Sequence, residues 1–159
     1  MKNIHVLAAP IVIALLTSCG GPGILTGLVP MEVTSVRSSD AVRAAALITQ
    51  YRAAHGLGPV SVDSRLNAAA EHQAREVAKA GRLFHGEFAS RMASYGVRRV
   101  AAENLGIGVP TVEEAIAQWK GSAQHNANLL IPDVTRIGFA RAVSKGGTFS
   151  EYWALVLSS

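Results

Sequence analysis

Apolar residues recur at helical spacing in two long stretches of this chain. In 41–55 they form one stripe, and Asp40 is in place to cap the helix that this stripe predicts. The second stretch is Ala-rich and runs from Asp63 to Gly81, with a capping residue at one end and a glycine stop at the other. Shorter helices are expected at 89–95, 111–121 and 122–129.

The hydrophobic pattern changes toward the C-terminal part of the chain. Residues 136–143 and 149–157, with a turn at 144–147 between them, have the pattern of a β-hairpin, and 97–100 is expected to form a brief strand. The last strand of the hairpin is apolar on both faces, which is typical of a strand inside a sheet that is covered on two sides. Together with the helices that precede it, this predicts an α+β fold, a three-layer α-β-α sandwich.

The first residues have the layout of an export signal. One Lys precedes a short apolar run that is too short to span a membrane, so residues 1–18 are interpreted as a signal peptide. Small residues then precede Cys19, which resembles the lipidation site of bacterial lipoproteins, and the alternative is ordinary cleavage that leaves a free thiol. Residues 19–38 lack a helical period and start with glycines, so they are predicted to be a lipidated cysteine and a flexible tether.

Size and charge narrow the remaining possibilities. Residues 39–159 are enough for one domain with one core. Cys19 is the only cysteine, so the core must be held by packing without an internal disulfide. The net charge is +4, but the arginines are dispersed and no basic stripe is interleaved with aromatic residues. Nucleic acid is therefore not expected as a partner, whereas the membrane is, through the anchor.

A few polar residues stand out as candidates for chemistry. His85 is in a turn after the long helix, where loops commonly present functional side chains. Glu103 lies in an otherwise apolar segment, so its carboxylate needs a partner or a solvated cleft. Ser122, His125 and Asn128 recur every three residues, which places them near one face of a helix. Ser122 is better explained as a helix cap than as a nucleophile.

These motifs, taken in order, resemble one family. The pieces that carry the resemblance are Phe84-His85, Ala102-Glu103-Asn104-Leu105, Trp119-x-x-Ser122-x-x-His125-x-x-Asn128, Ile137-Gly138-Phe139-Ala140 and a last strand that contains Trp153. Their order is similar to that of the bacterial branch of the CAP superfamily, which comprises cysteine-rich secretory proteins, antigen 5 and pathogenesis-related 1 proteins and is also called the SCP domain. The resemblance covers residues 40–157.

The resemblance implies an α-β-α sandwich with a cleft that contains two histidines and acidic residues. His85 and His125 resemble the cleft histidines, which in some members bind a divalent cation, so zinc or calcium is a possible cofactor. Glu103 resembles the acidic residue of the family motif. Ala102 replaces the usual Gly, Ser122 stands roughly where many members have a second Glu, and the family's disulfides are absent. The alternative to a metal site is a hydrogen-bonded cleft in which Glu103 bridges a histidine.

Three functions are compatible with these residues. The first is the binding of a small ligand, namely a lipid, peptide or glycan, in a cleft of His85, Glu103, Ser122, His125 and Asn128. The second is hydrolysis by a protease or esterase, with a histidine as base, Glu103 as its partner and Ser122 or a metal-bound water as the attacking group. The third is a structural or adhesive surface role. Binding is favoured, because Ser122 is better explained as a helix cap and nothing in the sequence supplies an oxyanion hole. The lack of a Gly-x-Ser-x-Gly elbow and of a His-Glu-x-x-His helix also counts against hydrolysis. The protein is expected outside the cytoplasm, on the outer side of the cytoplasmic membrane or at the outer membrane.

Overall fold

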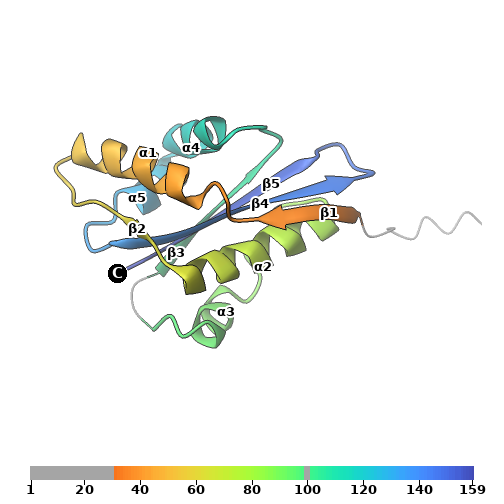
Figure 1. The fold of residues 1–159 in the computed structure, drawn as a ribbon, viewed down its shortest axis with the longest axis horizontal. Coiled ribbons are helices and arrows are strands. Elements are labelled where there is room, and N and C mark those ends of the chain that lie inside the picture. Colours follow the sequence, from red (N-terminus) through yellow and green to blue (C-terminus); the bar gives the residue numbers. More distant parts are fainter. Residues whose placement is uncertain (1–30, 99–100) are drawn as a thin grey trace, which may run out of the picture.

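The structure is a computed structural model, and it describes residues 31–98 and 101–159. The predicted signal peptide and Cys19 lie outside the described residues. The elements follow one another in the order β1 (Glu32–Arg37), α1 (Ala41–Ala53), β2 (Ser61–Val62), α2 (Ser64–Ala80), α3 (Phe88–Ser94), β3 (Ala101–Ile107), α4 (Val112–Lys120), α5 (Ala123–Leu129), β4 (Arg136–Lys145) and β5 (Glu151–Ser158) (Figure 1). None of the helices in the described parts of the chain is long and apolar enough to cross a membrane.

One sheet forms the middle of the molecule. Its strand order is β1-β4-β5-β3, and the short β2 pairs in parallel with the start of β4. Strands β4 and β5 form the predicted hairpin, in antiparallel register from Arg136 opposite Ser158 to Val143 opposite Glu151. From Tyr152 to Ser158, every residue of β5 is buried. This confirms that the last strand is covered on both faces, and it leaves β3 at one edge of the sheet.

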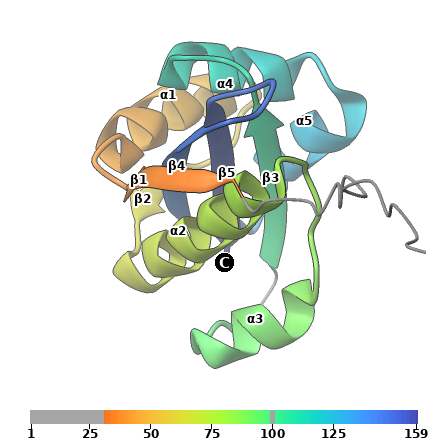
Figure 2. The same ribbon diagram turned by 90° about the vertical axis from the view of Figure 1, so that its right-hand side faces the viewer.

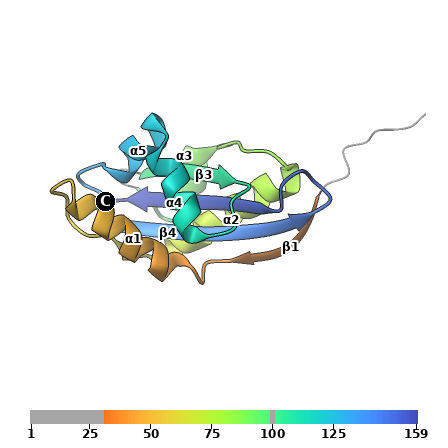
Figure 3. The ribbon, with the colours of Figure 1, turned by 90° about the horizontal axis from the view of Figure 1, so that it is seen from above.

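Helices cover both faces of the sheet. Figure 2 shows α1, α4 and α5 above it and α2 with α3 below it, and Figure 3 shows α1 and α4 lying along the sheet. Two apolar clusters fill the space between the layers. Trp119, Phe139 and Trp153 are in the cluster under α1 and α4, and Ala154 and Val156 are in the cluster against α2. The predicted three-layer α-β-α sandwich is therefore confirmed.

The predicted ends of the helices are observed in most places. The carboxylate of Asp63 accepts hydrogen bonds from the backbone N–H groups of the first turn of α2, and Gly81 ends that helix with the left-handed φ of 64° that glycine adopts without strain. Asp40 precedes α1 as predicted, but its side chain makes no capping bond. The backbone of Asp40 is helical (φ −84°, ψ −2°) rather than extended, so its carboxylate does not point at the free N–H groups of the first turn.

Two other predictions are wrong in part. Residues 32–37 were predicted to belong to the flexible tether, but they form β1, which pairs with β4. Val33 and Val36 pack against the α2 cluster, whereas the other residues of this edge strand are exposed, which is why the segment has the composition of a linker. The strand expected at 97–100 is also displaced, because Val97 and Arg98 lie outside any strand and β3 begins at Ala101. Residues 99–100 lie outside the described residues.

Helix α2 packs directly on the backbone of β4 at Gly138. A Cβ atom on Gly138 would lie 1.9 Å from the backbone carbon of Leu66, in the first turn of α2. Phe139 next to it donates its backbone N–H to the side-chain oxygen of Asn67 at 3.0 Å, which fixes α2 on β4. A side chain at position 138 would therefore push the α2 layer off the sheet.

We predict that Gly138→Ala lowers the free energy of unfolding by about 3 kcal/mol, because neither backbone can move aside without losing other contacts. Gly58→Ala is the matched control, since a Cβ there meets nothing within 4 Å, and we expect a change within about 0.5 kcal/mol. Urea denaturation of both variants measures the difference. Equal losses in the two variants would contradict the close packing of α2 on β4.

Candidate functional site

Glu103 is a buried carboxylate in the middle of the edge strand β3. It lies on the face of the strand that also carries Leu105, which packs in the α2 cluster. The residue is 5% exposed. One carboxylate oxygen accepts a hydrogen bond from Nδ1 of His85 at 2.9 Å, and the other pairs with the guanidinium of Arg91 on α3. Both oxygens of the predicted site carboxylate are therefore engaged by neighbouring side chains.

The charge of Glu103 is set by two opposing effects. Burial raises the pKa of its carboxyl group above the ordinary value, and the hydrogen bonds and charges of His85 and Arg91 oppose that rise. The side chain of Arg91 is itself only 9% exposed. The guanidinium of Arg91 and the carboxylate of Glu103 are therefore two nearly buried charged groups, each of which has the other as a partner. Removal of either partner would leave an uncompensated polar group in a dry place, which is expensive.

His85 is held in a short loop between α2 and α3. Gly86, directly after it, has a left-handed φ of 57°, and Arg91 donates to the carbonyl oxygen of His85 at 2.9 Å. The amide of Gln73 on α2 donates to the carbonyl of Phe84, directly before it. Although the backbone is fixed in this way, the side chain of His85 is 56% exposed. Glu103 uses Nδ1, so Nε2 keeps the capacity for a further hydrogen bond.

His125 approaches the same strand edge from α5, on the other face of the sheet. Its ring is half-buried, and its pKa is lowered by this burial and further by the charge of His85. The backbone carbonyl of His125 accepts a hydrogen bond from the side chain of Asn104 on β3 at 3.0 Å, which places His125 next to this strand. His85 and Glu103 are therefore in contact, and His125 lies beside the same strand. The lowered pKa favours the neutral form of the His125 ring at pH 7.

Asn128 ties α5 to β3 through hydrogen bonds. Its amide donates to the side-chain oxygen of Asn104 at 2.8 Å and to the carbonyl of Glu103 at 3.4 Å. Asn104, which is fully buried, donates in turn to the carbonyl of His125 at 3.0 Å. Asn128 was predicted to line the cleft, but its amide is used to position the helix that carries His125.

Ser122 makes neither the hydrogen bond of a helix cap nor that of a nucleophile beside its base. It stands at the start of α5 with an extended backbone, but its hydroxyl makes no capping bond, so its predicted capping role is wrong. Within the described parts of the chain, no hydrogen bond joins the hydroxyl to His85 or His125. A nucleophile needs a base within hydrogen-bond reach.

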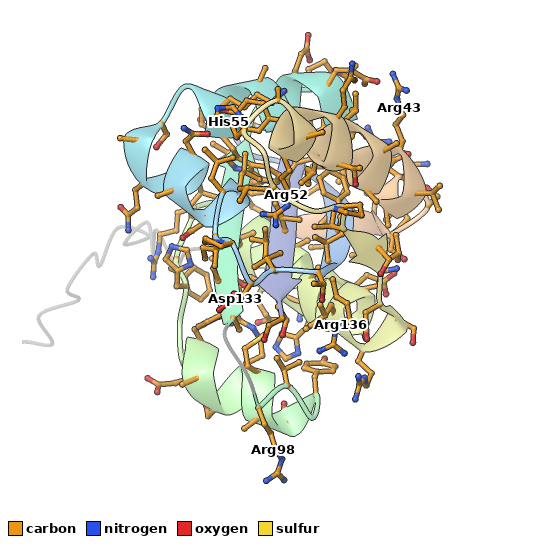
Figure 4. All side chains as sticks on the ribbon, turned by 90° about the vertical axis from the view of Figure 1, so that its left-hand side faces the viewer. Arg43, Arg52, His55, Arg98, Asp133 and Arg136 are labelled. Carbon is orange, nitrogen blue, oxygen red and sulfur yellow. The ribbon has the colours of Figure 1, made fainter. Side chains whose placement is uncertain are left out.

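Arg52, a residue of α1, binds the chain at the end of α5 and after it. The sequence pattern did not single it out. It is fully buried, and burial lowers its pKa. Its guanidinium donates to the main-chain oxygens of Gly58, Leu129, Ile131, Pro132 and Val134 at 2.9 to 3.3 Å. Figure 4 shows Arg52 inside the molecule, beneath α1. The connection between α5 and β4 is thus fixed by one cation.

The donor set does not fit a resident zinc or calcium ion. Within residues 31–98 and 101–159, no three His, Cys, Asp or Glu side chains are grouped in a way that could hold a metal. The reason at this site is that Glu103 is already engaged by His85 and Arg91, which leaves two imidazoles. A structural zinc site needs four ligands from the protein, and calcium prefers several carboxylate oxygens.

Residues 45–157 match the cysteine-rich secretory protein family, CAP. The chain belongs to this family. In sequence, the CAP domain is 30% identical over 98 residues to YkwD, an uncharacterised protein of Bacillus subtilis. The match covers 58% of this chain and 38% of YkwD, so this chain spans less than half the length of that relative.

Solved structures share the fold of this CAP domain. An outer surface protein of Borrelia burgdorferi has a TM-score of 0.67 and 18% identity, and the match covers 76% of this chain and 92% of that one. An extracellular SCP-domain protein of Bacillus anthracis has a TM-score of 0.64 and 19% identity, over 74% of this chain and 39% of that one. A cysteine-rich secretory protein of Staphylococcus aureus has a TM-score of 0.59 and 19% identity, over 74% of this chain and 37% of that one.

We predict that the pKa of His125, followed by NMR, lies below its ordinary value of about 6.5 and rises part of the way toward it in His85→Gln. Burial is the larger cause and stays in the variant. In the wild type the unfolded chain takes up this proton at a higher pH than the folded one, so the contribution of His125 to stability falls as pH drops from about 6.5 to the lowered value.

His55→Gln is the control for this titration, because His55 lies at the end of α1 and its ring bonds to the carbonyl of Tyr51 in the same helical turn. It should leave the pKa of His125 unchanged. If His85→Gln also leaves that pKa unchanged, the two rings do not share a site.

Proposed function

We propose that this CAP protein is exported, anchored by lipid at Cys19, and binds a small ligand of the cell envelope through His85 and His125. The observation that carries the proposal is the engagement of both Glu103 oxygens. One orients the exposed ring of His85 and the other is held by Arg91, so Glu103 acts as a support. Such a fixed pair of imidazoles, one exposed and one half-buried, is suited to hydrogen-bond a polar group of a ligand.

The surroundings of His85 support a ligand with an apolar part. A pocket of about 360 Å³ opens between α2 and α3 beside the His85 loop, and its lining includes Gln73, Phe84, Gly86 and Arg91. A volume of this size is typical of small-molecule sites. Phe84 supplies an aromatic wall, and His85 lies in the chain between Phe84 and Gly86, which both line the pocket. A lipid, a peptide or a glycan with an apolar substituent fits this combination.

Binding is a better account of the geometry than hydrolysis. A hydrolase of the serine type would need the Ser122 hydroxyl beside an imidazole, and the described residues contain no such hydrogen bond. A metal-dependent hydrolase would need more ligands than two histidines. We therefore propose a binding site that functions without a resident metal.

Two features support a location outside the cytoplasm. The first is the signal-like sequence that ends at Cys19. The second is that the neighbours in structure include an outer surface protein and an extracellular protein. With the anchor at Cys19 and β1 beginning at Glu32, the domain would stay near the membrane on a tether of residues 20–31.

We predict that the protein purified from its native membrane carries a ligand, detectable by native mass spectrometry and by lipid extraction. His85→Ala with His125→Ala should remove it, because both imidazoles that face the site are lost. His55→Ala should retain it, since that ring is exposed and bonds only within its own helix. Metal analysis of the same samples should give less than one equivalent of zinc or calcium.

Three results would contradict the proposal. If the wild type carries no ligand, and the double variant still folds, the domain is structural or adhesive. If peptide or ester turnover is found and Ser122→Ala abolishes it, the site is catalytic. If one equivalent of metal is present and the double variant loses it, the histidines are metal ligands.

A further inference from the structure

A recess at the end of the sheet gathers three arginines from three different elements. It is a pocket of about 220 Å³, bordered by the first turn of α2, the loop after α3, the start of β4 and the end of β5. Arg65 comes from α2, Arg98 from the loop and Arg136 from β4, and Asp63 is the acidic residue of the lining. In Figure 4, Arg98 and Arg136 lie in the same half of the molecule, and the exposed side chain of Arg98 extends outward from its end. This recess shares no lining residue with the pocket beside His85.

Asp63 cannot balance this positive charge alone. Its carboxylate already accepts the backbone N–H groups of Arg65 and Leu66 at 2.8 and 3.2 Å, which is its role as the cap of α2. Burial raises its pKa, but the bonds from Arg65 and from the backbone outweigh this and lower the pKa, so Asp63 is ionised at neutral pH. The guanidinium groups of Arg65 and Arg136 therefore share one carboxylate, and Arg98 adds a third positive charge at the border of the recess.

The arginines keep hydrogen-bonding capacity for a further acceptor. Arg65 reaches Asp63 at 3.3 Å and Arg136 reaches it at 3.4 Å, which is longer than a strong charge-assisted bond of about 2.8 Å. Arg136 also donates to the main-chain oxygen of Ser159. For Arg98, no hydrogen bond or ion pair occurs within the described parts of the chain. Each guanidinium has five N–H donors, so most of the donors in the recess are unused.

We propose that this recess binds a phosphate group, with Arg65 and Arg136 as its principal ligands and with the exposed side chain of Arg98 turning inward as a third. A tetrahedral phosphate presents oxygens in several directions and can accept from guanidinium groups that arrive from three elements. A planar carboxylate offers two oxygens and would leave one arginine without an acceptor. The phosphate belongs either to a free phosphate ion or monoester or to a phosphodiester polymer outside the cell. The site is separate from the one proposed for His85 and His125.

The test is a calorimetric titration of the purified protein with inorganic phosphate, sodium acetate and poly(glycerol phosphate) at constant ionic strength. Phosphate should bind saturably and more tightly than acetate. Arg65→Gln and Arg98→Gln should each weaken phosphate binding by about tenfold or more, since each removes a charged hydrogen-bond donor. Arg98 is exposed, so this variant should fold normally.

Arg43→Gln is the matched control, because it also removes one surface charge and its side chain is 61% exposed, compared with 55% for Arg65. Its affinity for phosphate should equal that of the wild type. Polymer that binds much more tightly per phosphate group than the free ion identifies a phosphodiester chain, and equal affinity identifies a free phosphate. The absence of saturable phosphate binding, or an equal loss in all three variants, overturns the proposal.

Discussion

The contact between Glu103, Arg91 and His85 is the interaction on which the site depends. A carboxylate in the middle of a nearly dry strand is costly unless every oxygen has a partner. Here the partners come from outside the sheet, one from α3 and one from the loop before it. The same bonds that make the burial of Glu103 tolerable therefore dock α3 beside the strand and orient the ring of His85. The same two contacts therefore contribute both to the stability of the fold and to the geometry of the site.

The other half of the site is built by neutral hydrogen bonds and by one buried cation. Asn104 faces the opposite side of β3 from Glu103 and receives α5 through Asn128, so neighbouring residues of one strand position the two histidines. Arg52 fixes the chain that follows α5 through main-chain oxygens. A helix of only seven residues, Ala123–Leu129, would be marginal without these bonds. Two hydrogen-bond networks thus meet at the edge strand β3, one through the side chain of Glu103 and one through that of Asn104.

The sequence predicted the layers and much of the site, because periodicity and glycine or acidic ends reflect local physics. It did not predict β1, since an edge strand with mostly exposed residues has no distinct pattern. Arg91 was missed because its short helix has the composition of a surface helix, and its partner is distant in sequence. Asn104 could have been found by the argument that singled out Glu103, as a polar residue in an apolar segment. Ser122 was misinterpreted because residue type shows that a hydroxyl can cap, not that it does.

The most direct test of this account is a double-mutant cycle on Glu103 and Arg91, measured by urea denaturation at pH 7. Glu103→Gln leaves a nearly buried guanidinium without its carboxylate, and Arg91→Met leaves the carboxylate without its cation, so each should cost about 3 kcal/mol. The double variant should cost less than the sum of the two by about 2 kcal/mol, because the second change removes a group that has already lost its partner. Costs that add within about 0.5 kcal/mol would contradict the claim that this buried pair holds the site together.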